Sequence, residues 1–121
     1  MVGAIITRFE KKGFTLKALK KIQLNEQILK EHYAHLVDKP FYPEIVKFMK
    51  RTPVVVMIWA GENAIDEVRR IIGSTDPKKA NLGTIRGDLA LAVDENLIHG
   101  SDSPENAALE IKRFFKDEEI F

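Results

Sequence analysis

An unbroken apolar run, Val54-Val55-Val56-Met57-Ile58-Trp59, lies near the middle of this 121-residue chain. It is rich in β-branched residues and has the length of a strand, and a continuous apolar run is typical of a strand buried on both faces. Such a strand needs packing partners above and below its sheet. The segments on either side of it must supply them.

Most of those segments repeat apolar residues at helical spacing. Asn25 and Ser103 can cap helices, Pro104 suits a first helical position, and Gly13 and Gly73 can end helices. Helices are predicted from Met1 to Gly13, from Asn25 to Leu36, from Pro43 to Met49, from Gly61 to Gly73 and from Ser103 to Phe115.

Two further strands are predicted, one over residues 14–22 with one solvated face and one over the apolar run 89–93. Between residues 74 and 87 the chain is polar and broken by proline and glycine, which indicates a long loop of the functional or interface kind. Strands separated by helices favour an α+β sandwich, with a sheet covered by helices. We predict one domain, residues 1–121.

Composition excludes several classes of protein. Hydrophobic residues make up 45% and charged residues 31%, and no apolar run is long enough to span a membrane. The absence of cysteine excludes disulfides and thiolate metal sites. Net charge is +1, so the pairs Lys11-Lys12, Lys20-Lys21 and Lys78-Lys79 indicate solubility rather than nucleic-acid binding. There is no secretory signal pattern, and the cytoplasm is the expected compartment.

Reaction chemistry is indicated by the connection between the last predicted strand and the last helix. His99 lies there, with Gly100 to permit close approach of a ligand and Ser101 to offer a hydroxyl. Glu110 is about two turns into the following helix and can reach back towards the imidazole. The alternative is that His99 is a hydrogen-bonded bystander and Glu110 a solvated helix residue.

Other sites for phosphate or metal are not supported. The chain contains neither a G-x-x-x-x-G-K-[ST] loop nor a G-x-G-x-x-G turn. His32 and His35 are three residues apart, which is not the i, i+4 spacing of zinc-binding helices. We therefore predict no metal ligands among the protein side chains.

The segments GTIRGD and NLIHGSDSPE resemble the active-site region of the nucleoside diphosphate kinases, in order and in separation. RFEKKGF, KEHYAHL, DKPFYPEIVKFM, PVVVMIW and STDP resemble further family segments, so the resemblance covers nearly the whole chain. It implies a ferredoxin-like fold with a four-stranded antiparallel sheet. It also implies transfer of the γ-phosphate of a nucleoside triphosphate to a nucleoside diphosphate, through a phosphorylated histidine and with ping-pong kinetics.

The resemblance assigns a role to each matching residue. His99 matches the phosphorylated histidine, Glu110 the carboxylate that fixes its tautomer, and Ser101 and Tyr33 residues beside it. The nucleotide-binding residues implied are Phe41 for base stacking, Arg69, Thr75 and Arg86 for phosphate, and Asn96 for the sugar. Core packing is the alternative for the two aromatic residues, and a surface position the alternative for Arg69.

The same resemblance implies partners. Mg²⁺ is expected to arrive bound to the nucleotide phosphates, in keeping with its preference for oxygen ligands and water. Nucleoside tri- and diphosphates are the expected substrates, and a homo-oligomer, a hexamer or a tetramer, is the expected assembly.

One departure from the family pattern bears on activity. The family begins with a strand ending in a Lys-Pro-Asp segment whose lysine binds phosphate, whereas this chain starts at Met1 inside the first predicted helix. We expect that first strand to be missing from this chain. The alternative function is then a nucleotide-binding or oligomer-forming protein with little or no turnover.

Overall fold

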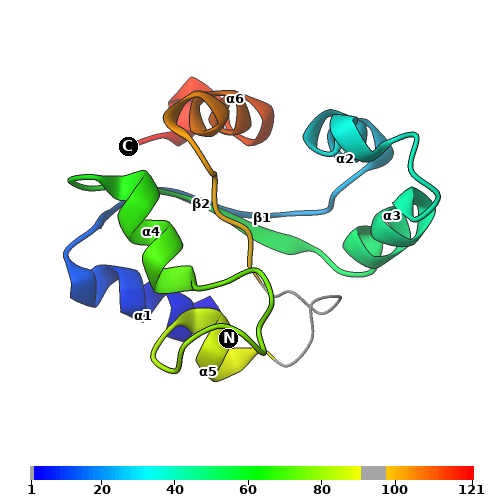
Figure 1. Ribbon diagram of the computed structural model, residues 1–121. Coiled ribbons are helices and arrows are strands. Elements are labelled where there is room, and N and C mark those ends of the chain that lie inside the picture. Colours follow the sequence, from blue (N-terminus) through cyan, green and yellow to red (C-terminus); the bar gives the residue numbers. More distant parts are fainter. Residues whose placement is uncertain (1, 91–97) are drawn as a thin grey trace.

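A computed structural model describes residues 2–90 and 98–121. Its helices and strands follow one another along the chain as shown in Figure 1. They are α1 (Val2–Lys12), β1 (Thr15–Ile22), α2 (Glu26–His32), η1 (Ala34–Leu36), α3 (Tyr42–Lys50), β2 (Val54–Ala60), α4 (Ala64–Ile72), α5 (Ile85–Leu89), α6 (Pro104–Phe114) and η3 (Asp117–Glu119).

β1 and β2 form an antiparallel sheet. Thr15 pairs with Ala60 at one end and Ile22 with Val54 at the other, and the register shifts between Leu16 and Ala18. Helices lie on both sides of the two strands, with α1 and α5 on one side and α2 and α6 on the other (Figure 1). The predicted α+β class, a sheet covered by helices, is confirmed.

The main core lies between α1, α4, α5 and one face of the sheet. Ile5 and Phe9 of α1 meet Ile72 and Ile85 there, and all four are buried. Partly buried side chains complete this cluster: Phe14, Met57, Trp59, Val68, Ile71, Leu89 and Ile98. The valine-rich run is thus the packing surface that its composition predicts, although its residues are half-buried rather than fully enclosed.

Local capping signals set several helix ends where the sequence predicts them. The side chain of Asn25 accepts from the backbone N–H of Ile28 at 2.9 Å, and that of Ser103 accepts from Asn106 at 3.1 Å. Gly73 ends α4 with a φ of 92°, a conformation that favours glycine. The helix predicted to reach Leu36 stops at His32, and the chain continues as the 3₁₀ turn η1.

The segment from residue 74 to residue 93 departs from the sequence-based prediction. The expected loop ends at Thr84, whose hydroxyl caps α5 by accepting from the N–H of Gly87 at 3.0 Å. The strand predicted over residues 89–93 is wrong at Leu89, which ends that helix, and residues 91–93 lie outside the described part. None of the described helices is long and apolar enough to cross a membrane.

Candidate active site

The connection before α6 carries His99, and Arg86 holds its backbone through a hydrogen bond. Arg86 is buried, and its guanidinium donates to the carbonyl of Gly73 at 3.0 Å and to that of Ile98 at 2.8 Å. Burial, and then the charge of Arg69, lower the pKa of Arg86. Arg86 therefore fixes the backbone beside His99 to the end of α4, a scaffold role beyond the phosphate contact predicted for it.

Gly100 lies close to core side chains of α4. A Cβ at this position would lie 2.8 Å from Cδ1 of Ile72, which is a core residue. The chain therefore runs close to α4 at Gly100, and the close approach of a ligand to this glycine stays a prediction.

His99, Ser101 and Glu110 meet as the sequence predicts. The Nε2 of His99 lies 2.8 Å from Oε1 of Glu110, and the hydroxyl of Ser101 donates to Oε2 of the same carboxylate. The side chain of His99 is 58% exposed, whereas that of Glu110 is 15% exposed. The imidazole can thus meet a ligand in solvent while its partner is shielded.

The carboxylate also sets the tautomer of the ring. Burial alone would raise the pKa of Glu110, but the hydrogen bonds from Ser101 and His99 outweigh it and the net pKa is lowered. An ionised carboxylate only accepts hydrogen bonds, so Nε2 of His99 must donate to it. The lone pair of the neutral imidazole is then on Nδ1.

A second histidine, His32, contacts His99 and is not among the site residues predicted from the sequence. The rings of His32 and His99 meet edge to face, with centroids 4.9 Å apart at 82°. Burial lowers the pKa of His32 to about 4, with His99 and Arg113 adding to the effect. Arg113 donates to Nδ1 of His32 at 2.9 Å.

The sequence contains a signal for the position of Arg113, which contacts His32. Glu110 and Arg113 are three apart on α6, so their side chains share a helix face. Tyr33, which is predicted to lie near His99, packs on His32, and the ring centroids of Tyr33 and His32 are 4.8 Å apart. Burial, and then the charge of Glu110, raise the pKa of Tyr33.

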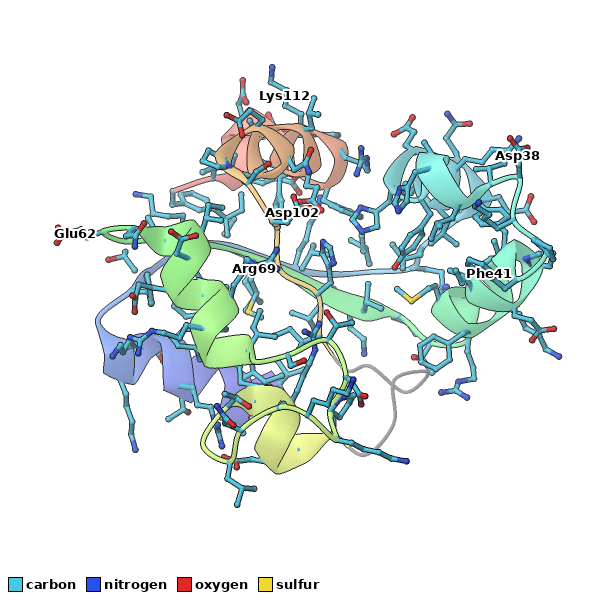
Figure 2. All side chains as sticks on the ribbon, in the orientation of Figure 1. Asp38, Phe41, Glu62, Arg69, Asp102 and Lys112 are labelled. Atoms are coloured by element: carbon cyan, nitrogen blue, oxygen red, sulfur yellow. The ribbon has the colours of Figure 1, made fainter. Side chains whose placement is uncertain are left out.

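The predicted nucleotide-binding residues occupy a wider area around His99. Arg69 is exposed on α4 and lies next to Asp102 in Figure 2. The pKa of Asp102 is lowered by its hydrogen bond from Asn106 first, and among weaker causes by Arg69 and His99. Arg69 therefore adds positive charge on the His99 side of α4.

The other three predicted residues differ in how the structure places them. Phe41 precedes α3 and is 50% exposed, so the alternative of core packing is wrong for it. Figure 2 labels Phe41 in the α3 region. Thr75 is exposed shortly after α4. Asn96 lies outside the described residues.

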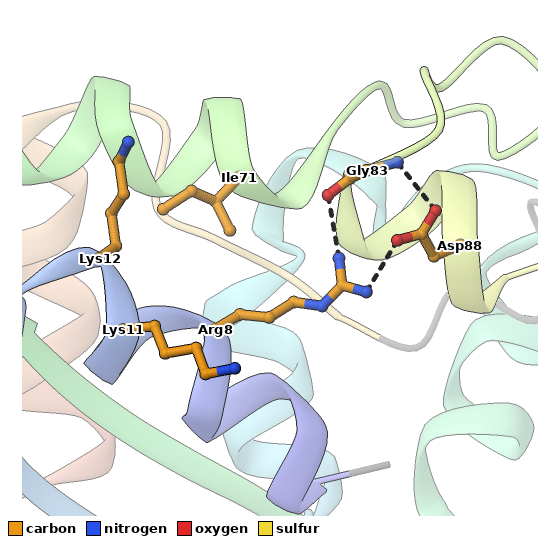
Figure 3. Close-up of a pocket in the computed structure, with 6 residues that line it drawn as sticks. All are labelled: Arg8, Lys11, Lys12, Ile71, Gly83 and Asp88. Atoms are coloured by element: carbon orange, nitrogen blue, oxygen red, sulfur yellow. Dashed lines mark hydrogen bonds and ion pairs between the residues drawn. The ribbon is translucent and has the colours of Figure 1, made fainter.

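A separate hollow of about 380 Å³ lies beside α1, α4, α5 and the turn before α5 (Figure 3). Arg8, Lys11, Lys12, Ile71, Gly83 and Asp88 line it. Arg8 is bonded to Asp88 at 2.7 Å and to the carbonyl of Gly83 at 3.0 Å. None of the predicted site residues that the structure describes is among the residues lining this hollow.

Comparison with known proteins gives a consistent family match. A family model described as nucleoside diphosphate kinase matches residues 1–120. A nucleoside diphosphate kinase of Parabacteroides distasonis is 52% identical over 121 residues, which are 100% of this chain and 79% of that protein. Nucleoside diphosphate kinase 3 of Mus musculus is 50% identical over 120 residues, or 99% of this chain and 71% of that protein.

Solved structures match over nearly the whole chain as well. A halophilic nucleoside diphosphate kinase from Halobacterium salinarum, in complex with CDP, has a TM-score of 0.93 at 41% identity and covers 99% of this chain and 80% of its own. A nucleoside diphosphate kinase family protein from Babesia bovis has a TM-score of 0.95 at 38% identity, covering 99% and 81%. This similarity confirms the ferredoxin-like α+β fold.

Proposed function

Because this chain belongs to the nucleoside diphosphate kinase family, and so to the transferases, we propose that it moves the γ-phosphate of a nucleoside triphosphate to a nucleoside diphosphate through a phosphohistidine at His99. The observation that carries this proposal is the contact between Nε2 of His99 and Glu110 at 2.8 Å. It leaves Nδ1 of an exposed ring as the nucleophile.

The reaction is a pair of in-line displacements at phosphorus. In the first, Nδ1 of His99 attacks the γ-phosphorus, an N–P bond forms, and the bond to the bridging oxygen breaks to release the diphosphate. In the second, a terminal oxygen of another nucleoside diphosphate attacks the same phosphorus and the N–P bond breaks. Two easier transfers thus replace one, which gives ping-pong kinetics.

Glu110 stabilises the intermediate between these steps. Attack through Nδ1 leaves a positive charge on the ring, whose Nε2 keeps its proton. The ionised carboxylate of Glu110 balances that charge and holds the ring orientation, while Ser101 holds the carboxylate.

Positive charge is also needed at the transferring phosphoryl group, because its equatorial oxygens carry the charge of the transition state. We assign this task to Arg69 and Arg86, with Thr75 as a further phosphate donor. Phe41 supplies a stacking surface for the base, Asn96 contacts the sugar, and Tyr33 supports the histidines. Stacking has little base preference, which suits a broad range of nucleotides.

Mg²⁺ fits this site as a companion of the nucleotide. Both oxygens of Glu110 are engaged, by His99 and by Ser101, so an ion held mainly by phosphate oxygens and water suits the donors present. Bound there, it supplies charge neutralisation of the phosphates.

Labelling with γ-labelled ATP tests the proposal. The full chain is expected to acquire label that is stable to base and labile to acid, and to pass it to an added diphosphate. His99→Ala abolishes the label, whereas His35→Ala, which changes an exposed histidine, retains it. Circular dichroism of each variant checks folding. Label persisting in His99→Ala would refute His99 as the acceptor, and binding without turnover would favour the alternative function.

We further propose that the protein is a homo-oligomer, a hexamer or a tetramer. Large apolar side chains are exposed on α1 and β1, with Val2 at 43%, Leu16 at 37% and Leu19 at 47%. Large apolar side chains left exposed in this way favour association. Sedimentation equilibrium measures the mass directly, and a monomer at micromolar concentration would contradict this proposal.

A further inference from the structure

His32, His99 and Glu110 form a group that phosphoryl transfer does not fully use. One potential ligand atom from each side chain lies within 4.8 Å of those of the other two. Nε2 of His99 is 2.8 Å from Oε1 of Glu110, and Nδ1 of His32 is 3.7 Å from the same oxygen. Three donors from α2, α6 and the connection before α6 therefore converge on one point.

The spacing suits a small tetrahedral ion. Zinc bonds to nitrogen and oxygen are about 2.1 Å long, which places the ligand atoms about 3.4 Å apart around a tetrahedral centre. The separations in this group bracket that value. Small side-chain rotations would therefore seat an ion, with a water as fourth ligand.

The donor set selects a class of metal. Two imidazoles and one carboxylate suit zinc and its neighbours cobalt, nickel and copper, whereas Mg²⁺ prefers oxygen ligands throughout. The nucleotide-bound Mg²⁺ would therefore not compete for this position. In the sequence, the spacing of His32 and His35 does not suit a zinc-binding helix, so no metal ligands are predicted. The structure places His32 next to His99 and Glu110, a grouping that the spacing does not show.

Arg113 is the neighbour that opposes a cation here. Its guanidinium cannot lose a proton, so the 2.9 Å contact with Nδ1 of His32 shows that this nitrogen carries a lone pair. A metal ion must displace that donor before His32 can bind it. Glu31, whose Oε2 is 3.9 Å from Nε of Arg113, offers the displaced guanidinium another partner.

We propose that His32, His99 and Glu110 form a binding site for a divalent ion of the zinc class, in competition with Arg113, and that the bound ion inhibits the phosphorylation of His99. The inhibition rests on the function proposed above, whereas the binding does not. An ion on Nε2 takes the place of the proton there, and the neutral ring then carries its proton on Nδ1. Nδ1 no longer has the lone pair that attacks phosphorus, and the Glu110 carboxylate is bound to the ion instead of to the ring.

Cobalt spectroscopy on the nucleotide-free full chain tests the binding. Tetrahedral Co²⁺ with nitrogen ligands absorbs strongly in the visible range, and Zn²⁺ added afterwards displaces it. The chain has three histidines and no cysteine, so one variant at His32 and one at His35 show which histidines bind the ion together with His99. His32→Gln should weaken Co²⁺ binding at least about tenfold, and His35→Gln should leave it unchanged. No tetrahedral spectrum, or one that survives in His32→Gln, would overturn the site.

Arg113→Leu provides a test that does not remove a ligand. It keeps all three donors and removes the competing cation, so Co²⁺ should bind more tightly than to the wild type, by about tenfold. Equal or weaker binding would refute the competition with Arg113.

Labelling with Mg²⁺-ATP in the presence of Zn²⁺ then tests inhibition. The label on His99 should fall as the site fills, and should do so at lower Zn²⁺ concentration in Arg113→Leu. Full labelling of protein that is saturated with Zn²⁺ would overturn the inhibitory part. If the chain took no label at all, the cobalt spectrum would still decide the binding.

Discussion

The carboxylate of Glu110 is the side chain on which the geometry of the nucleophile depends. It accepts a hydrogen bond from the Nε2–H of His99 on one oxygen and from the hydroxyl of Ser101 on the other. The carboxylate is shielded from solvent, whereas the imidazole of His99 is exposed. Water therefore screens the negative charge of Glu110 only weakly where it acts on the ring. Removing that charge should affect the reaction more than the fold.

Glu110→Gln is expected to slow phosphorylation of His99 by about 10²- to 10⁴-fold. A neutral amide cannot balance the charge of the phosphorylated ring, and its NH₂ group would favour the wrong tautomer. Rapid-quench measurement of label incorporation gives the rate. Glu105→Gln, an exposed position on the same helix, is the matched control and should react at the wild-type rate. A normal rate in Glu110→Gln would remove Glu110 from the mechanism.

At this scale the sequence predicted the groups that lie close together along the chain better than those that meet through the fold. His99, Ser101 and Glu110 are separated by a turn and two helical turns, so spacing alone brings them within reach. His32 arrives from a helix far away in the sequence and packs edge to face on His99. The closeness of Gly100 to Ile72 of α4 likewise depends on the fold and not on local spacing.

The helices and strands show the same division between local and distant causes. Asn25, Gly73 and Ser103 act on backbone groups within a few residues, and the ends that they define follow from the sequence. α5 has five residues, too few to show helical periodicity. Its last residue begins an apolar run that reads equally as a strand, the ambiguity expected of short apolar segments.

One ion pair joins two of these elements and yields a pH-dependent prediction. Asp88 of α5 accepts from the N–H of Gly83 at 2.8 Å and from Arg8 of α1 at 2.7 Å (Figure 3). The bond from Gly83, and then that from Arg8, lower the pKa of Asp88. A carboxyl whose pKa is lowered by folding stabilises the protein above its unfolded pKa, and this contribution is lost as pH falls through the folded pKa.

Asp88→Asn should therefore lower the free energy of unfolding near neutral pH, and the difference from the wild type should shrink at about pH 3. Urea denaturation at both pH values measures it. Asp66→Asn, an exposed carboxylate on α4, is the control and should change stability little at either pH. A difference that stays constant between the two pH values would show that the contacts with Gly83 and Arg8 do not stabilise the ionised form of Asp88.

The whole molecule is organised so that the site depends on elements from both sides of the sheet. His32 comes from α2 and Glu110 from α6, whereas Arg69 and Arg86 come from α4 and α5, which build the main core with α1. With a net charge of +1, attraction for phosphate must be local to these arginines. A ligand that bridges the two sides should consequently stabilise the fold as a whole.

Nucleoside diphosphate is therefore expected to raise the melting temperature of the chain. A ligand at 100 times its Kd adds about 2.7 kcal/mol to the free energy of unfolding, and for a domain of this size that corresponds to roughly 10 °C. Arg69→Ala should lose most of this increase, because it removes the exposed cation beside Asp102 and His99. Arg70→Ala is the matched control, since Arg70 is the next residue of α4 and is already paired with Glu67 at 2.6 Å. Calorimetric scans across a nucleotide titration measure the shift, and the same increase in Arg69→Ala and Arg70→Ala would exclude Arg69 from phosphate binding.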